Sequence, residues 1–258
     1  MTIPEANKLE PMAQKPSTKS SKPTGEQALI EAIRRRSARA TAGGKRVRLG
    51  IGDDCAAVRV PAGHEMLVTT DFSLEGRHFR RDWHPARSVG HRVLARGLSD
   101  LAAMGAEPAA AFLSLALPLS VARDAAWLEG FLDGFLQLAQ QFHVPLAGGD
   151  TSESPQDSVL ADIVLLGSAP AGKALLRSKA RAGDMLYCTG ALGGAAAELA
   201  ALAKSPKAFR AATATDPHPH LFPAPRIAVG LALRRRRLAT ACMDLSDGLS
   251  SDLAHLCD

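Results

Sequence analysis

The sequence predicts an α/β (α+β) protein whose chain forms two successive units. Three observations support this prediction. Segments with strand-like and helix-like hydrophobic periodicity alternate irregularly, a new series of such segments begins near Pro170, and 46% of the 258 residues are hydrophobic, enough for a packed core. Residues 1–24 are rich in Pro, Lys and Ser and lack aromatic side chains, so we expect a disordered tail. The two units therefore span residues 25–169 and 170–258.

Three long helices are expected in the first unit, at residues 26–36, 85–104 and 124–142. In each of them apolar residues recur at helical spacing and form one face. Gly105 follows the second helix as a stop signal. The large apolar side chains of the third helix, Trp127 and Phe131 among them, are interpreted as core.

Strands are expected where short apolar runs are bounded by Gly or Pro. In the first unit these are two short strands within residues 57–70, around a turn at 61–63, and the segments 110–117, 145–147 and 159–166. In the second unit we expect a strand at 185–189, an Ala-rich helix ending at Leu202, a helix at 226–237 and a further helix starting near Gly248. A Pro-rich loop separates the first two of these helices.

Charge and composition exclude several classes of function. The net charge is +5, but the basic residues gather in the tail and in two Arg clusters that are typical of solvated surface, and only 4% of residues are aromatic, so nucleic-acid binding is not expected. The longest apolar stretch, residues 108–119, is too short for a membrane helix, and the N-terminus lacks the features of a secretory signal. Four scattered cysteines indicate neither a zinc site nor a disulfide framework. We therefore expect a cytoplasmic protein.

Aspartates recur beside small residues at the expected ends of strands and helices. The instances are Gly50-Ile51-Gly52-Asp53-Asp54, Thr69-Thr70-Asp71, Leu98-Ser99-Asp100, Gly148-Gly149-Asp150-Thr151 and Asp244-Leu245-Ser246-Asp247-Gly248. Mg²⁺ prefers carboxylate and other oxygen ligands together with substrate phosphates, and Gly lets a backbone approach a phosphate closely. Any one of these segments could be a turn or a helix cap, and Asp53 in particular could be a cap. If they converge, they form a metal-polyphosphate site.

The common nucleotide-binding and hydrolase motifs are absent from the sequence. No GxxxxGK[ST] loop is present, and Gly50-x-Gly52 lacks the third Gly of a dinucleotide fold. Neither a GxSxG elbow nor an HExxH helix is found. A phosphate-transferring enzyme built on this chain would need another scaffold.

The aspartate segments, together with Glu75-Gly76-Arg77-His78-Phe79, Leu101-Ala102-Ala103-Met104-Gly105-Ala106 and Gly172-Lys173-Ala174-Leu175-Leu176-Arg177-Ser178, resemble the thiamine-monophosphate kinase family in order and near spacing. The resemblance implies transfer of the γ-phosphoryl group of ATP to thiamine monophosphate, which gives thiamine diphosphate. It also implies the fold of aminoimidazole ribonucleotide synthetase. In that fold the N-terminal mixed-sheet domains of a homodimer pair into a barrel, and an α/β domain follows.

The resemblance also implies roles for individual residues. The oxygen ligands of several Mg²⁺ ions would be Asp54, Thr69, Thr70, Asp71, Asp100, Asp150, Asp244 and Asp247. ATP would be bound by Gly149, Asp150, Arg177 and Ser246, and thiamine monophosphate by His78. Glu75 beside Gly76 could be no more than a turn residue. Transfer is expected to be direct and in line, without a general base, because the acceptor phosphate oxygen is already ionised.

Two departures from the family leave alternatives open. Gly97 stands where the family usually has Asn. The family continues beyond residue 258 with further strands and helices, so the resemblance implies a C-terminal truncation that leaves a partial second domain. One alternative is therefore a catalytically impaired fragment that binds Mg-ATP or acts as an assembly partner. Another is a different ATP-dependent synthetase of the same superfamily, which the Leu98–Ala106 and Asp244–Gly248 segments disfavour.

Overall fold

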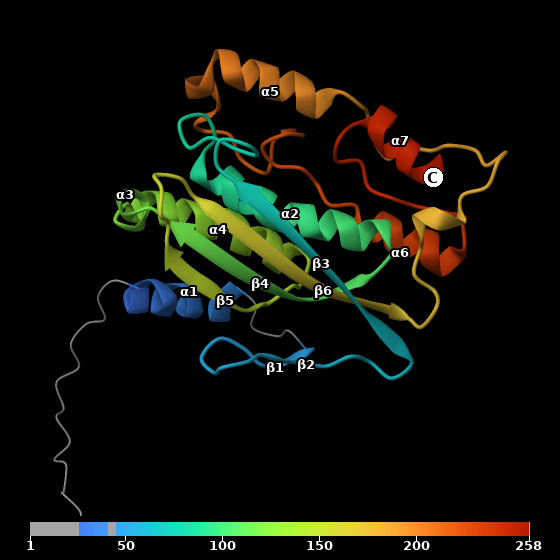
Figure 1. Ribbon diagram of the computed structural model, residues 1–258, viewed down its shortest axis with the longest axis horizontal. Helices are drawn as coiled ribbons and strands as arrows, with labels where there is room; N and C mark the ends of the chain where they lie inside the picture. The colour runs from blue at the N-terminus through green and yellow to red at the C-terminus, as the bar shows by residue number, and fades with distance from the viewer. Residues whose placement is uncertain (1–25, 41–44, 258) are drawn as a thin grey trace, which may run out of the picture.

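A four-stranded mixed sheet with helices packed on one face forms the first part of the chain (Figure 1). The computed structural model describes residues 26–40 and 45–257, so the expected tail lies outside the described residues. The strand order is β3-β6-β4-β5, with β3 His64–Leu74, β6 Leu160–Pro170, β4 Glu107–Leu117 and β5 Leu146–Glu153. β6 is antiparallel to both neighbours, whereas β4 and β5 are parallel. The mixed sheet expected for the first unit is confirmed.

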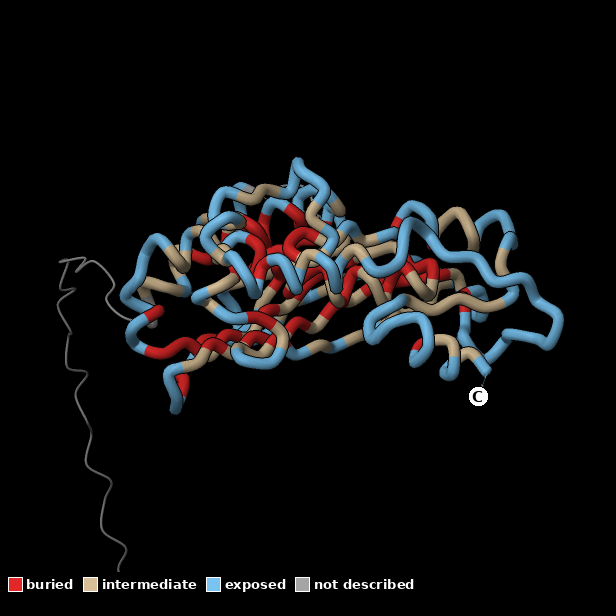
Figure 2. The backbone as a smooth tube through the Cα atoms, turned by 90° about the horizontal axis from the view of Figure 1, so that it is seen from above, coloured by how far each residue is buried: buried red, intermediate tan, exposed pale blue. Residues whose placement is uncertain are grey.

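The three long helices predicted for this unit are present, as α1 Glu26–Ala40, α2 Ala86–Ala103 and α4 Ala125–Gln141, with α3 Leu119–Ala122 as a short addition. α2 contacts three strands of the sheet, and α4 packs against α2. Alternate strand residues such as Ile163 and Leu165 are fully buried in the core that these elements share. Buried segments accordingly run through the middle of the molecule (Figure 2).

Among residues 26–40 and 45–257, nothing packs over the exposed apolar side chains on the other face of the sheet. Val68 and Phe72 on β3 have 62% and 60% of their surface exposed, although both are large and apolar. A second, two-stranded sheet pairs β1 Val47–Leu49 with β2 Ala57–Val58. The two short strands expected within residues 57–70 thus exist, but they do not pair with each other, and β1 was not predicted.

Helices and loops make up the described residues that follow β6. They are η1 Arg177–Lys179, α5 Gly194–Lys204, η2 Pro206–Phe209, α6 Ile227–Arg236 and α7 Leu249–Cys257. The strand predicted at residues 185–189 is wrong. Met185 and Tyr187 are 78% and 89% exposed, and no strand of the described residues lies beside them to pair with their backbone groups. The division into 25–169 and 170–258 stays a prediction.

A buried polar contact fastens the loop after η2 to α2. The Nε2 atoms of His84 and His220 lie 3.0 Å apart, and the Arg92 guanidinium donates to the His220 carbonyl. Glu198 of α5 accepts the backbone N–H groups of His220 and Leu221, at 2.6 and 3.2 Å. Burial, and then the positive charge of Arg92, lower the pKa of His84 to about 4 and that of His220 to about 3. Both imidazoles are therefore neutral near pH 7.

Among the described residues, no helix is long and apolar enough to span a membrane.

The contact between α2 and α4 requires glycine. A Cβ atom added to Gly134 would lie 1.8 Å from the Arg87 carbonyl oxygen, and one added to Gly90 would lie 1.9 Å from that of Phe131. The two helices can approach this closely only because both positions lack a side chain.

We expect Gly134→Ala to lower the free energy of unfolding by about 1–3 kcal/mol, because the added methyl group forces the two helices apart. The matched control is Gly130→Ala in the same helix, whose added Cβ would lie 3.2 Å from the Ala86 Cβ and 3.7 Å from the Arg87 backbone nitrogen. Chemical denaturation followed by circular dichroism measures both variants. Equal stability of the two variants would contradict the packing described above.

The histidine contact predicts a loss of stability in acid. Between the ordinary pKa of 6.5 and the lowered values, the unfolded chain binds more protons than the folded chain, so the free energy of unfolding falls as the pH is lowered. We expect the melting temperature to drop between pH 7 and about pH 4 and His84→Gln to lose part of that dependence. His255→Gln, at an exposed position in α7, is the control and should keep the full dependence.

Candidate functional site

Three of the predicted metal-binding carboxylates meet where β3 faces the C-terminal half of α2. The hydroxyl of Thr69 on β3 donates to Asp100 on α2, and the hydroxyl of Ser99 donates to Asp244 at 2.9 Å. Asp71 follows on the same face of β3. We call Asp71, Asp100 and Asp244 the acidic cluster. It unites three motifs that lie up to 173 residues apart in the sequence (244 minus 71).

Burial raises the pKa of Asp100 above its ordinary value, and the negative charges of Asp244 and Asp71 raise it further. The hydrogen bond from Thr69 and the charge of Arg96 act in the opposite direction. Asp244 and Asp71 are thus close enough to Asp100 to disfavour its ionised form. A cation beside Asp100 would stabilise that form.

An arginine already stands in this cluster. Arg96 Nε donates to Asp71 Oδ2 at 2.6 Å, and Nη2 donates to Oδ1 at 2.5 Å. The side chains are 31% and 25% exposed, so the ion pair is largely withdrawn from water. The sequence analysis missed Arg96. The signal was available, because Arg96 precedes Asp100 by four residues on a predicted helix and therefore shares its face.

The remaining predicted metal ligands lie elsewhere. Strand alternation turns Thr70 to the open face of the sheet, where its hydroxyl donates to Asp162 at 2.9 Å. Asp150 is on β5, at the opposite edge of the sheet from Asp71 on β3. Asp54, in the β1–β2 connection, and Asp247, before α7, are exposed. Among the described residues, no group of three or more His, Cys, Asp or Glu side chains stands close enough to hold a metal ion.

His78, the predicted substrate contact, lies in the turn that follows β3. Its Nδ1 accepts the backbone N–H of Leu74 at 2.9 Å, so in the neutral ring the proton is on Nε2. Burial lowers the pKa of His78, and the positive charge of Arg96 contributes next. Near pH 7 the ring is therefore a neutral hydrogen-bond donor through Nε2.

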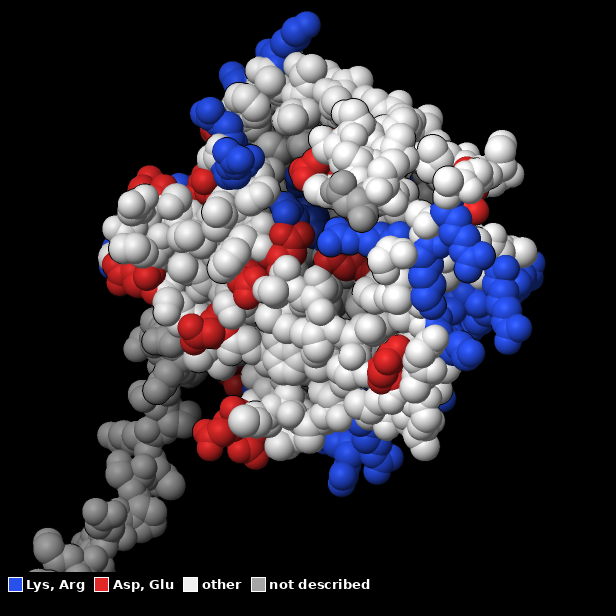
Figure 3. Space-filling model, turned by 45° about the vertical axis from the view of Figure 1, so that its right-hand side comes forward, with Lys and Arg blue, Asp and Glu red and all other residues white. Residues whose placement is uncertain are grey.

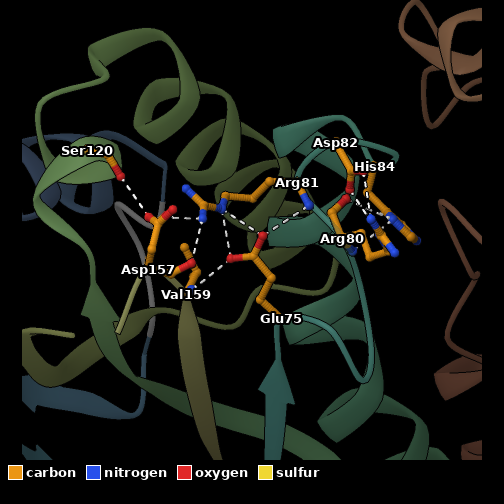
Figure 4. A network of polar contacts seen from close by, with 8 residues as sticks. All are labelled: Glu75, Arg80, Arg81, Asp82, His84, Ser120, Asp157 and Val159. Carbon is orange, nitrogen blue, oxygen red and sulfur yellow. Dashed lines mark hydrogen bonds and ion pairs between the residues drawn. The ribbon is translucent and has the colours of Figure 1, made fainter. Parts of the chain in front are cut away.

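A partly buried ion pair closes the turn that carries His78 (Figure 4). Arg81 Nε lies 2.7 Å from both carboxylate oxygens of Glu75, and the Val159 N–H donates to Glu75 Oε2 at 2.9 Å. Arg81 also donates through Nη2 to the carbonyl of Asp157 at 2.9 Å. The His78 turn is thereby tied to the segment that precedes β6. Glu75 is therefore more than the turn residue that the sequence suggested.

The predicted nucleotide-binding residues come from separate segments. At Gly149 φ is +150°, and an added Cβ would lie 1.9 Å from the Leu113 carbonyl oxygen, so only glycine fits there. Arg177 is exposed in η1. The loop that contains Ser246 is shaped by Asp252, which is 1% exposed and accepts the N–H groups of Ser246, Asp247 and Gly248 at 2.9, 3.2 and 3.2 Å. On the face seen in Figure 3, acidic and basic side chains adjoin in a hollow near the centre of the molecule.

Comparison with known proteins gives this arrangement a family. The model of the AIR synthase related protein, N-terminal domain, matches residues 52–169. The curated thiamine-monophosphate kinases of Salmonella typhimurium and Escherichia coli K12 are each 44% identical to this chain over 214 residues, which are 81% of this chain and 62% of theirs. The chain thus spans about three fifths of the length of these curated relatives.

Solved structures agree with this assignment. Thiamine-monophosphate kinase from Stenotrophomonas maltophilia K279a is 38% identical, with a TM-score of 0.76, and the match covers 90% of this chain and 71% of that one. AaThiL complexed with AMPPCP and TMP is 29% identical, with a TM-score of 0.66 and coverages of 90% and 69%. The chain therefore belongs to the thiamine-monophosphate kinase family.

Proposed function

We propose that this chain catalyses transfer of the γ-phosphoryl group of ATP to thiamine monophosphate, giving thiamine diphosphate. The observation that carries the proposal is the acidic cluster, in which motifs from β3, α2 and the segment before α7 converge beside His78. Carboxylates next to basic side chains suit a reaction between two phosphates. A relative complexed with AMPPCP and TMP supports the assignment of these substrates.

In this proposal, separate groups of residues bind thiamine monophosphate and ATP. His78 donates its Nε2 proton to the phosphate of thiamine monophosphate as a neutral hydrogen-bond donor. Gly149, Asp150, Arg177 and Ser246 bind ATP, with the Gly149 backbone close to the phosphates. The acceptor oxygen is ionised at neutral pH, so direct in-line attack needs no general base. The protein thus acts by orienting the two phosphates and balancing their charge.

Several Mg²⁺ ions are part of the proposal, held by the predicted aspartates and threonines. This part rests on chemistry, because hard cations prefer oxygen ligands and the carboxylates of the acidic cluster repel one another. The arrangement of the described residues does not by itself form a metal site.

We further propose that the chain works as a cytoplasmic homodimer whose N-terminal sheets pair into a barrel. The open face of the sheet supports this, because Val68 and Phe72 are 62% and 60% exposed there. A second copy of the sheet would remove these apolar side chains from water. The barrel itself follows from the family resemblance.

A second candidate function is nucleotide binding without completed transfer. It is favoured by the share of the curated relatives that the chain spans, 62% of their length. Family residues outside that share would then be needed for turnover. The two candidates differ in whether thiamine diphosphate forms.

The decisive measurement is to incubate the purified chain with Mg²⁺, ATP and thiamine monophosphate and to quantify thiamine diphosphate. We expect product, and we expect Asp100→Asn to lower kcat/KM by about a hundredfold, as loss of a charge at a reacting centre does. Asp216→Asn, at an exposed loop position, is the control and should retain activity. Intact ATP binding without product would favour the second candidate.

The ion pair that closes the His78 turn gives a separate prediction. Glu75→Gln weakens the contact with Arg81, so the turn loosens, and we expect KM for thiamine monophosphate to rise about tenfold while KM for ATP stays constant. Asp82→Asn is the matched control, because it breaks the neighbouring Arg80–Asp82 pair, whose side chains are 51% and 60% exposed. The positioning role would be refuted if both variants raised KM equally, or if Glu75→Gln raised KM for both substrates.

A further inference from the structure

The guanidinium of Arg96 occupies the carboxylate that the proposed function assigns to a metal ion. We propose that Arg96 is the resident cation of the acidic cluster, and that its positive charge weakens the binding of a divalent cation at Asp71. The inference rests on the proposed function, which supplies the cation. It concerns the affinity for that cation and not the transfer reaction itself.

The Arg96 guanidinium lies against both carboxylate oxygens of Asp71, to which a metal ion would bind. Two donors of one planar guanidinium engage both oxygens of Asp71, at 2.6 and 2.5 Å. This bidentate arrangement is the strongest that an arginine makes with a carboxylate. Arg96 is a residue of α2 and Asp71 of β3, and contacts between these two elements hold the backbones of the pair. The guanidinium takes one lone pair on each oxygen and leaves one free on each, so a metal ion that binds Asp71 stands beside this positive charge.

The surroundings explain why a cation stands here. Asp100 feels the negative charges of both Asp244 and Asp71, and Arg96 counteracts them. A guanidinium carries a permanent positive charge in proteins, and this charge balances the cluster. A divalent cation that enters the cluster brings more charge, but it meets the repulsion of a fixed positive group. At this range that repulsion is strong unless the guanidinium moves away.

Arg96 therefore weakens metal binding in the free protein. No comparable group holds the other two carboxylates among the described residues. Asp100 and Asp244 accept neutral hydroxyl hydrogen bonds, from Thr69 and Ser99.

The test measures Mn²⁺ binding to the free protein, without nucleotide, by electron paramagnetic resonance of the unbound ion. We expect Arg96→Met to lower the Kd for Mn²⁺ about tenfold or more relative to the unchanged chain. Arg87→Met is the matched control, because Arg87 is on the same helix and pairs with Asp133 at 3.3 Å. It should leave the Kd unchanged.

A double variant locates the effect. If the gain arises from freeing Asp71, adding Asp71→Asn to Arg96→Met should abolish it. Circular dichroism melting shows whether each variant is folded. Should Arg96→Met not fold, Arg96→Gln replaces it, because it removes the charge while keeping a polar side chain, and the same decrease in Kd is expected.

The outcomes separate this inference from the proposed function. Tighter Mn²⁺ binding by the Arg96 variant, lost on Asp71→Asn, supports the inference whether or not thiamine diphosphate forms in the activity assay. An unchanged or weaker Kd in a folded Arg96 variant overturns the inference and leaves the proposed function standing. If neither the unchanged chain nor the variants bind Mn²⁺, both the inference and the metal part of the proposed function fail.

Discussion

The packing of α2 between the sheet and α4 is the contact on which the rest of the structure depends. Gly90 and Gly134 let the backbones of the two helices come into direct contact. Because this contact is closely packed, it fixes the position of α2. The opposite side of α2 then presents Arg96 and Asp100 to β3, and Arg92 to the loop around His220. One rigid helix thereby joins the core, the acidic cluster and the following helical segment.

Charge balance is the second constraint. Carboxylates gathered from three distant segments would repel one another, and burial makes that repulsion stronger. The positive charge of Arg96 counteracts this repulsion at Asp100. The same charge lowers the pKa of His78 and so helps to keep that imidazole neutral. A single guanidinium thus links the protonation of the proposed substrate contact to the occupancy of the acidic cluster.

Local periodicity predicted the long helices because their signal lies within one helix face. Local periodicity failed where a segment forms a strand only if a neighbouring strand pairs with it. The apolar run at 185–189 has the composition of a strand but has no neighbouring strand among the described residues. Conversely, β5 extends through Gly148 and Gly149, residues of low strand propensity, because β4 pairs with them. The candidate site also depends on partners that are distant in the sequence. The motifs predicted the carboxylates, but Thr69 and Thr70 lie on opposite faces of the sheet. The hydrogen bonds from Arg96 to Asp71 depend on the packing of α2 against β3, which no local pattern encodes.

The strand order limits how the predicted ligands can act together. Asp71 and Asp150 belong to the two edge strands, β3 and β5, with β6 and β4 between them. Three strand spacings separate these edges by about 14 Å, whereas oxygens that share one Mg²⁺ lie within about 4 Å of each other. One ion therefore cannot bind both carboxylates of a single chain in this sheet. If both are ligands, they hold different ions, or the partner copy of the proposed dimer brings one edge to the other. The first arrangement requires more than one cation, and the acidic cluster around Asp100 is then only one of several positions at which charge is neutralised. In the second arrangement one ion binds carboxylates of both copies, and the site is complete only in the dimer.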